Sequence, residues 1–530
     1  MIRTSARFPS RRSHSLTCVA VLAAGTLLLG CAVPGTALSQ TRTRQTDPPV
    51  AEQRRHEPDA SFMRAALGLP FIEEAQLEEM IYELASPAFA GRLTGTAGYD
   101  LAARFGVEHM RAAGLQPGGP EGTWLQPFTV ETNLITGPME LRVEHEGWRG
   151  APYRFGRDYV ARGFTGSGRI ESAEVVFVGY GLVDNEGDWD DYAGIDTRGK
   201  AALMFMGAPR NGVDWGERSR PRYKATVAKE RGAVAILLID DPGDGVLSPI
   251  VSVYHGMVGS QQTDLPQLSI RNRIADDLLY GLPHTAVNLR RAINESGGSH
   301  SMELNTRVTI EAHAEYTAEA QTWNVVGWIE GSDPAVRDEW VVVGGHLDHV
   351  GQQADMLCAG AQDNASGSVM VLGMAAAMAR APVKPRRSVC FVLFAGEELF
   401  LLGSEYFASD PPRPIENCVG MINLDMVGTG PRLAMDGGAT TPIFQEFVEQ
   451  ADRYYGGLGI AERDPTQIRA GASDHSAFVN AGVPTVYFHS SGARGRAHTP
   501  EDVPETIDYD AFYRTTRVVY MTLFQMADRP

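Results

Sequence analysis

The sequence predicts an α/β protein whose main sheet is mostly parallel (mixed), with helices on both faces and an inserted β-rich unit. Three observations predict it. After residue 305, short apolar runs alternate with segments of helical spacing. These runs are apolar throughout, which is typical of parallel strands that helices cover on both faces. Finally, 530 residues at about 150 per domain suggest about three domains, or two large ones.

The composition is that of a globular protein and excludes one class of partner. Hydrophobic residues make up 43% and charged residues 21% of the chain. The formal net charge is −18, and no basic stripe with interleaved aromatic residues is present. Because such a chain repels phosphate backbones, we expect no nucleic-acid partner.

The first 30 residues predict a signal peptide of the lipoprotein type. An arginine-rich start precedes an apolar run that ends in Leu28-Leu29-Gly30-Cys31 and is short for a membrane span. This ending resembles the bacterial lipobox, in which the cysteine is lipidated. We therefore expect an exported protein, either anchored to the outer membrane through lipid on Cys31 or, after cleavage behind Ser39, periplasmic or extracellular. Arg11-Arg12 hints at a twin-arginine signal, but the apolar pair expected after it is absent.

Residues 31–70 are expected to be a flexible tether, since the stretch 32–60 is rich in Thr, Arg, Gln and Pro. Residues 71–160 are assigned to the N-terminal part of the main domain, with helical spacing over 72–115 and a glycine-rich link at 91–98.

Residues 161–305 form the predicted inserted unit. Apolar strands are expected near 174–181, 201–206 and 232–239, with a helix at 224–231 before the last of them. This stretch resembles the protease-associated domain, a β-rich module often inserted in exported peptidases, and such a unit would cap or shape a cleft.

The main α/β domain is expected over residues 306–530. Residues 307–316 alternate, with Val308, Ile310, Ala312 and Ala314 on one face and His313 on the solvated face. Further strands and helices follow in alternation. The strands are expected at 324–329, 340–344, 388–394, 419–424 and 484–488, and helices at 366–379 and 509–526.

Polar residues follow successive strands of this domain. Each residue alone is weak evidence for a functional site, but together they are strong evidence, because ligands bind outside the carboxyl ends of strands in open α/β sheets. Ser366 is a plausible N-cap of the helix that follows one of the loops. The polar residues are His346 and Asp348, Asp363, the pair Glu397-Glu398, Asp425 and His498.

Imidazole and carboxylate ligands without thiolates suit zinc, with manganese or cobalt as substitutes. Five ligands are too many for one tetrahedral catalytic zinc with an open position. Two zinc ions sharing one carboxylate would each have three protein ligands. Three carboxylates and one hydroxide balance their four charges, so a hydroxide-bridged pair is expected.

The motifs His-x-Asp, Gly-x-x-Asp-Asn-x-Ser-Gly, Glu-Glu, Asn-x-Asp-Met, Ser-Asp-His and His-Thr-x-x-Asp resemble those of the co-catalytic zinc aminopeptidases. That family includes bacterial leucyl aminopeptidases, glutamate carboxypeptidase II and the transferrin receptor. The resemblance covers residues 320–525 and the helices of 72–115.

The resemblance implies a role for each motif residue. Asp363 would bridge the metals and precede a cis peptide bond to Asn364. Glu398 and His498 would complete one metal site, and His346 and Asp425 the other. Glu397 would be the general base, and Asp348 would orient His346.

Two departures from the family leave questions open. The tyrosine that stabilises the oxyanion in some relatives is absent from 469–472, so Arg469, His475 or Tyr487 would substitute. Residues 351–358 differ from the usual short loop, and His349 is left unassigned. The preferred side chain and the oligomeric state also stay open.

The predicted function is that of an exported metalloaminopeptidase with two zinc ions and peptide substrates. Alternatives are a carboxypeptidase of the same fold, a glutaminyl cyclase-like acyl transferase with one zinc, and a non-catalytic receptor that has lost its ligands. Five cysteines are too few for a disulfide scaffold, and at most one disulfide is expected among Cys358, Cys390 and Cys418.

Overall fold

The computed structural model describes residues 58–184, 189–240, 259–430, 432–437, 441–462, 471–490 and 496–529. The predicted signal peptide, Cys31 and most of the predicted tether lie outside these residues. Helix α1 (Ala60–Ala66) and a 3₁₀ turn at Leu69–Phe71 begin inside the stretch predicted as tether. Among the described helices, none is both long and apolar enough to cross a membrane.

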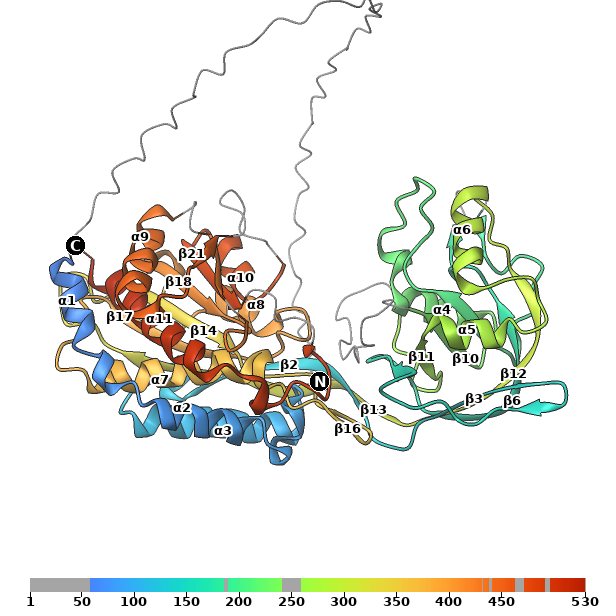
Figure 1. Cartoon of the computed structure of the whole chain (residues 1–530), viewed down its shortest axis with the longest axis horizontal. Helices are drawn as coiled ribbons and strands as arrows, with labels where there is room; N and C mark the ends of the chain where they lie inside the picture. Colours follow the sequence, from blue (N-terminus) through green and yellow to red (C-terminus); the bar gives the residue numbers. More distant parts are fainter. Residues whose placement is uncertain are drawn as a thin grey trace, which may run out of the picture. The chain divides into compact units, whose positions relative to one another are not determined.

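The main sheet is mixed, with a parallel centre, and confirms the predicted fold class (Figure 1). Its order is β1-β13-β17-β14-β18-β21-β19-β20, with β2 also paired to β13. β17, β14, β18 and β21 are parallel neighbours, whereas β13 lies antiparallel to β17, and β19 to β21. The strands are β1 (Gln116–Pro117), β2 (Leu125–Ile135), β13 (Ala314–Ile329), β14 (Trp340–His346), β17 (Ser388–Phe394), β18 (Cys418–Leu424), β19 (Leu433–Asp436), β20 (Ala461–Glu462) and β21 (Thr485–Ser490).

Helices cover both faces of this sheet because its central strands are apolar on both sides. Val341 and Val343 of β14 join the core formed with α2, α3, α7 and α11. Val342, one residue out of phase, joins the opposite core with Phe407 of α8 and Phe478 of α10. The helices are α2 (Glu74–Leu84), α3 (Ala97–Ala112), α7 (Ser366–Arg380), α8 (Leu402–Ser409), α9 (Pro442–Ala451), α10 (His475–Asn480) and α11 (Tyr509–Asp528).

A second sheet of eight strands has the order β4-β3-β12-β6-β9-β10-β11-β5 and its own buried cores. Its bounds are wider than the predicted 161–305, because β3 pairs with β12 at positions such as Val143 and Val308. The elements are β3 (Glu140–His145), β4 (Trp148–Arg149), β5 (Tyr159–Ala161), β6 (Gly168–Phe177), β9 (Ala201–Phe205), α4 (Pro221–Glu230), β10 (Ala235–Ile239), β11 (Gln267–Ile270), α5 (Asn272–Leu278), α6 (Ala286–Ser296) and β12 (Met302–Ala312). A two-stranded hairpin, β7 (Val183–Asp184) and β8 (Trp189–Asp190), and a hairpin in the main domain, β15 (Gln352–Gln353) and β16 (Met356–Leu357), complete the strands.

The structure confirms the buried strand face at 308–312 and corrects the predicted helix cap. Val308, Ile310 and Ala312 are buried, and half-buried His313 lies 2.9 Å from Glu311. Ser366 is not the N-cap of α7, as predicted, but its first residue, and Ala365 is the N-cap. The Ser366 hydroxyl donates to the Gln362 carbonyl instead of capping the helix. Cys358, Cys390 and Cys418 are buried free thiols, so none of the three forms a disulfide.

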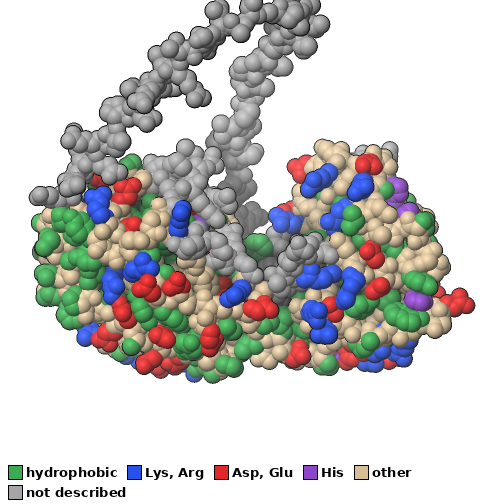
Figure 2. Space-filling model, viewed as in Figure 1, with side chains coloured by type: hydrophobic (Ala, Val, Ile, Leu, Met, Phe, Trp, Pro, Cys, Tyr) green, Lys and Arg blue, Asp and Glu red, His purple; other side chains and the backbone are tan. Residues whose placement is uncertain are grey.

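Acidic and basic side chains are intermixed on the face visible in Figure 2. This mixture agrees with the absence of a basic stripe in the sequence.

Candidate active site

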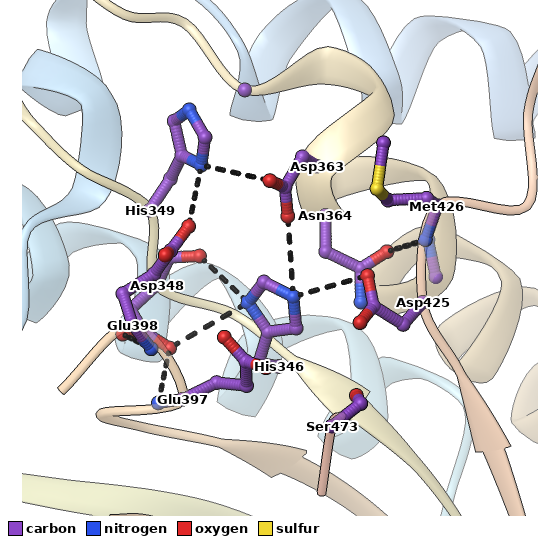
Figure 3. Close-up of polar contacts among 12 residues, drawn as sticks. His346, Asp348, His349, Asp363, Asn364, Glu397, Glu398, Asp425, Met426 and Ser473 are labelled. Atoms are coloured by element: carbon purple, nitrogen blue, oxygen red, sulfur yellow. Dashed lines mark hydrogen bonds and ion pairs between the residues drawn. The ribbon is translucent and has the colours of Figure 1, made fainter. Parts of the chain in front are cut away.

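The predicted site residues converge at the carboxyl ends of the parallel strands (Figure 3). His346 is the last residue of β14, and Asp425 directly follows β18. Glu397 and Glu398 lie in the loop between β17 and α8, and Asp363 lies in the turn Ala361–Ala365 that precedes α7. Although these segments are distant in sequence, the sheet order places β17, β14 and β18 side by side.

The ligand atoms gather into two groups, each with its atoms within 4.8 Å of one another. Asp363 lies between them. Its Oδ2 is 3.2 Å from Nε2 of His498, and its Oδ1 is 3.3 Å from Nε2 of His346. The first group is His349, Asp363, Glu398 and His498; the second is His346, Glu397 and Asp425.

The remaining contacts complete each group. Glu398 Oε2 is 2.9 Å from His498 Nε2, and Asp425 Oδ1 is 3.4 Å from His346 Nε2. One carboxylate therefore faces two imidazoles, and each imidazole faces a further carboxylate. This is the arrangement that the family resemblance implies for a pair of metals.

The donor chemistry fits divalent cations. His346, Asp363 and Asp425 are 1%, 5% and 7% exposed, so their polar atoms are largely out of water. Buried carboxylates are costly unless cations compensate them. Within the described chain, the buried guanidinium of Arg92 donates to four backbone carbonyls and not to these carboxylates. Nitrogen and oxygen donors without thiolates suit zinc.

Glu397 and Glu398 have opposite electrostatic environments. Burial, reinforced by the neighbouring Glu398 carboxylate, raises the pKa of Glu397 well above its ordinary value. Burial also disfavours ionised Glu398, but the nearby His498 and His349 imidazoles lower its pKa to about 2. Glu397 thus binds a proton more readily than Glu398 does. This difference is the one expected between a general base and a charged metal ligand.

Asp348, which the resemblance places behind His346, contacts that ring most closely through its backbone carbonyl. Nδ1 of His346 is 3.1 Å from the backbone carbonyl of Asp348 and 3.8 Å from its carboxylate. The carboxylate instead accepts hydrogen bonds from the backbone N–H groups of Glu397, at 3.2 Å, and Glu398, at 3.4 Å. Burial raises the pKa of Asp348 to about 6. His346 is thus oriented by the backbone, and the Asp348 carboxylate holds the glutamate loop.

The peptide bond between Asp363 and Asn364 is cis, as the resemblance implies. The Asn364 amide donates to the Leu424 carbonyl at 2.8 Å, and its oxygen accepts from the Met426 backbone at 3.1 Å. The Asp502 carboxylate accepts from the backbone N–H of Asp363 at 3.0 Å. The motif residues Asn364 and Asp502 therefore hold the turn that carries Asp363.

His349 belongs to the site, although sequence reasoning left it unassigned. It is fully buried, and its Nδ1 lies 3.0 Å from Oε1 of Glu398. Its position directly after His-x-Asp was the available signal, but histidines packed beside metal sites are common enough to make that signal ambiguous.

One of the three oxyanion candidates, Tyr487, lies beside Asp425, and a second, His475, stacks on Tyr487. The Tyr487 hydroxyl is 3.5 Å from Oδ2 of Asp425. His475 stacks on Tyr487, with ring centroids 4.5 Å apart. Arg469 lies outside the described residues. The geometry therefore connects the Tyr487–His475 pair to the second ligand group.

Part of the chain is similar to known peptidases. Residues 324–523 match peptidase family M28. Leupeptin-inactivating enzyme 1 of Streptomyces exfoliatus is 34% identical over 169 residues, covering 31% of this chain and 35% of that protein. A probable leucine aminopeptidase of Arthroderma otae is 25% identical over 233 residues, covering 39% of this chain and 64% of the relative. The chain spans about a third of the length of the first of these relatives.

Solved structures share the fold over most of the chain. An aminopeptidase from Aneurinibacillus sp. strain AM-1 superposes with a TM-score of 0.62 at 22% identity, covering 88% of this chain and 96% of that one. BSAP, a zinc aminopeptidase from Bacillus subtilis, gives 0.55 at 19% identity, covering 86% and 96%. The resemblance stated from the motifs is thus confirmed: residues 324–523 match the model of peptidase family M28.

Proposed function

We propose that this protein is an exported exopeptidase that removes N-terminal residues from peptides with two zinc ions bound at the site. The observation that carries the proposal is Asp363, whose two carboxylate oxygens each face a different imidazole, His346 and His498. The family match and the relatives named as aminopeptidases and zinc metalloproteases support the reaction class.

Five of the described residues would bind the two metal ions, and Glu397 would transfer the proton. Asp363 would be shared by both ions, Glu398 and His498 would hold one, and His346 and Asp425 the other. When bound, the two zinc ions would acidify the water that they share and polarise the scissile carbonyl. Glu397 accepts the proton of the attacking water on its carboxylate and returns it to the leaving amine as the C–N bond breaks.

The charge of the site favours the amino end of a peptide over the carboxyl end. Acidic side chains at the site include Glu397, Asp425 and the buried Asp474, whose pKa burial raises to about 7. No lysine or arginine forms an ion pair with Glu397 or Asp425 among the described residues. A carboxypeptidase needs cationic groups for the substrate carboxylate, so a site whose described residues offer none there favours the amino end.

A panel of amino-acyl peptides and their N-blocked counterparts, assayed with and without a chelator, tests the proposal. We expect cleavage of the free-amine peptides only, abolished by the chelator and restored by zinc. Preferential cleavage from the carboxyl end would support the carboxypeptidase. Loss of ammonia from N-terminal glutaminyl peptides, with one zinc per chain and no hydrolysis, would support the cyclase.

Export and lipidation are part of the proposal and rest on the sequence of residues 1–31. A single acyl chain anchors only marginally, so multiple acylation is implied. Fractionation of wild type and Cys31→Ser tests this: we expect the wild type in membranes and the variant in the soluble fraction. Equal solubility of both would support cleavage after Ser39.

We also propose that the second sheet belongs to a protease-associated domain.

A further inference from the structure

The loop that carries Glu397 and Glu398 is held by side chains from other segments at four consecutive backbone N–H groups. Ala395 N–H donates to Oδ1 of Asn324 in β13, at 3.0 Å. Gly396 N–H donates to Oγ1 of Thr94, at 2.9 Å. The next two N–H groups donate to the Asp348 carboxylate, as described above. Every amide from Ala395 to Glu398 thus has a side-chain acceptor.

Thr94 links the Asp348 carboxylate to the backbone of Gly396. While its hydroxyl oxygen accepts from Gly396, its proton is donated to Oδ2 of Asp348 at 2.9 Å. Thr94 and Asp348 are fully buried, so neither side chain is open to solvent in the folded protein. Removing the hydroxyl would leave the buried Gly396 N–H without its acceptor and would remove the shortest of the three hydrogen bonds that the Asp348 carboxylate accepts.

The backbone of this loop decides which way the two glutamates point. Gly396 has φ +67°, a left-handed conformation that glycine adopts readily and that turns the chain just before Glu397. Because Glu397 and Glu398 are adjacent, a small rotation of their peptide planes moves both carboxylates at once. A displacement of about 1 Å at a reacting group can cost about 100-fold in rate.

We propose that Thr94 is a positioning residue of this enzyme. Its hydroxyl fixes the Asp348 carboxylate against the backbone of the glutamate loop, and thereby directs Glu397 toward the second ligand group and Glu398 toward the first. This inference rests on the proposed function for the role of Glu397, but its effect on metal binding is independent of the reaction.

Thr94→Val tests the inference, because valine keeps the shape and removes the hydroxyl. We expect kcat to fall about 10- to 100-fold with KM within about twofold, and zinc affinity, measured by competition with a chromogenic chelator, to fall about 10-fold. Thr94→Ser keeps the hydroxyl and should return both quantities to within about threefold of wild type. The matched control is Thr96→Val in the same segment, whose hydroxyl donates to the Leu93 carbonyl at 2.7 Å and touches no part of the loop; it should behave as wild type.

Other outcomes overturn the inference. Thr94→Val could lower the melting temperature while kcat and zinc affinity stay at wild-type values, which would show a structural role alone. If neither Thr94→Val nor Thr94→Ala folds while Thr94→Ser does, the hydroxyl is required for the fold and the positioning role fails. If wild type cleaves no peptide, the proposed function fails, but the ratio of zinc affinities still decides the role of Thr94.

Discussion

At the scale of single residues, the proposed peptide hydrolysis depends on two adjacent glutamates that have different partners. Glu398 is paired with His498 at 2.9 Å and with His349 at 3.0 Å. Glu397 belongs to the group of His346 and Asp425, and burial raises its pKa well above the ordinary value. A buried carboxylate with a raised pKa takes up a proton readily, while one held by two imidazoles stays ionised.

Conversion of each glutamate to glutamine should therefore give different phenotypes. We expect Glu397→Gln to keep both metals and bind substrate, with kcat lower by about 10²- to 10⁴-fold, because the amide is no base. Glu398→Gln should instead lower metal occupancy, with partial rescue by excess zinc. Metal content and single-turnover kinetics of both variants measure this. If the phenotypes were exchanged, the assignment along the pair would be off by one residue.

Most motif residues could be predicted from the sequence because they follow strands that are recognisable by their apolar runs, and Asp363 because its motif opens a helix. The supporting residues could not. Thr94 lies 302 residues before Gly396, and Arg92 lies 255 residues before Leu347, in a segment that the sequence predicts as a glycine-rich link. Only the folded chain brings a buried hydroxyl or guanidinium to a distant backbone, so no local pattern marks it.

At the scale of elements, Arg92 joins four segments of the main domain. Its fully buried guanidinium donates to the carbonyl at the end of α2, Leu84, and to Leu347 after β14. It also donates to Ala359 and Gly360, ahead of the turn that carries Asp363. Burial lowers its pKa, to about 10, yet it stays charged at neutral pH.

Arg92→Met should destabilise the protein by at least about 3 kcal/mol, because several buried carbonyls lose their donor at once. Urea unfolding followed by circular dichroism measures the change. The control is Arg104→Met on the exposed side of α3, expected within about 0.5 kcal/mol of wild type. Equal stability of the two variants would show that water replaces the lost guanidinium.

Lys224 of α4 is the corresponding buried cation of the second sheet. It is fully buried and donates to the carbonyls of Phe205 at 2.9 Å and Gly207 at 2.5 Å. Burial lowers its pKa from 10.5 to about 7, and the nearby Asp191 only partly opposes this effect. The charged form is thus less favourable in the folded state than in the unfolded state.

The pH dependence of stability follows from that sign. With a depressed folded-state pKa, the contribution of Lys224 is complete above about pH 10.5 and is lost as pH falls through 7. From pH 7 to 9, we expect wild type to gain about 2 kcal/mol relative to Lys224→Met. The raised pKa of Asp191, about 6, places its own titration below this window. Parallel stability curves for the two proteins would contradict the assignment.

Element prediction succeeded where strands bury their own faces and failed where pairing is distant. β14 and β17 are buried along their whole length and were recognisable as apolar runs. β3 has half-exposed positions and belongs to the second sheet only through its pairing with β12, more than 150 residues later. A local sequence pattern does not show such pairing, so the place of β3 in the second sheet could not be predicted.

At the scale of the whole molecule, each sheet has its own hydrophobic core and does not need the metals to bury it. The main core joins α2, α3, α7 and α11 to the central strands, and the second sheet has separate cores. The proposed ligands lie at the end of β14 and in loops at the same end of the main sheet, outside these cores. Metal binding should therefore order the site without creating the fold.

Removal of metal should abolish activity and leave the far-UV circular dichroism nearly unchanged. The melting temperature should fall, since metal binds the folded state only. Chelator treatment followed by spectra, thermal melts and zinc add-back measures all three. Loss of most secondary structure on chelation would show that the metals are structural, as in small zinc domains.

Titration of the metal-free protein with zinc tests the central claim most directly. Activity on a free-amine amino-acyl substrate is measured against bound zinc per chain, with the N-blocked substrate as control. Two ligand groups with Asp363 facing an imidazole of each predict that activity reaches its maximum at two zinc ions per chain and that the blocked substrate stays intact. Full activity at one zinc, or activity in the metal-free protein, would contradict the two-metal aminopeptidase.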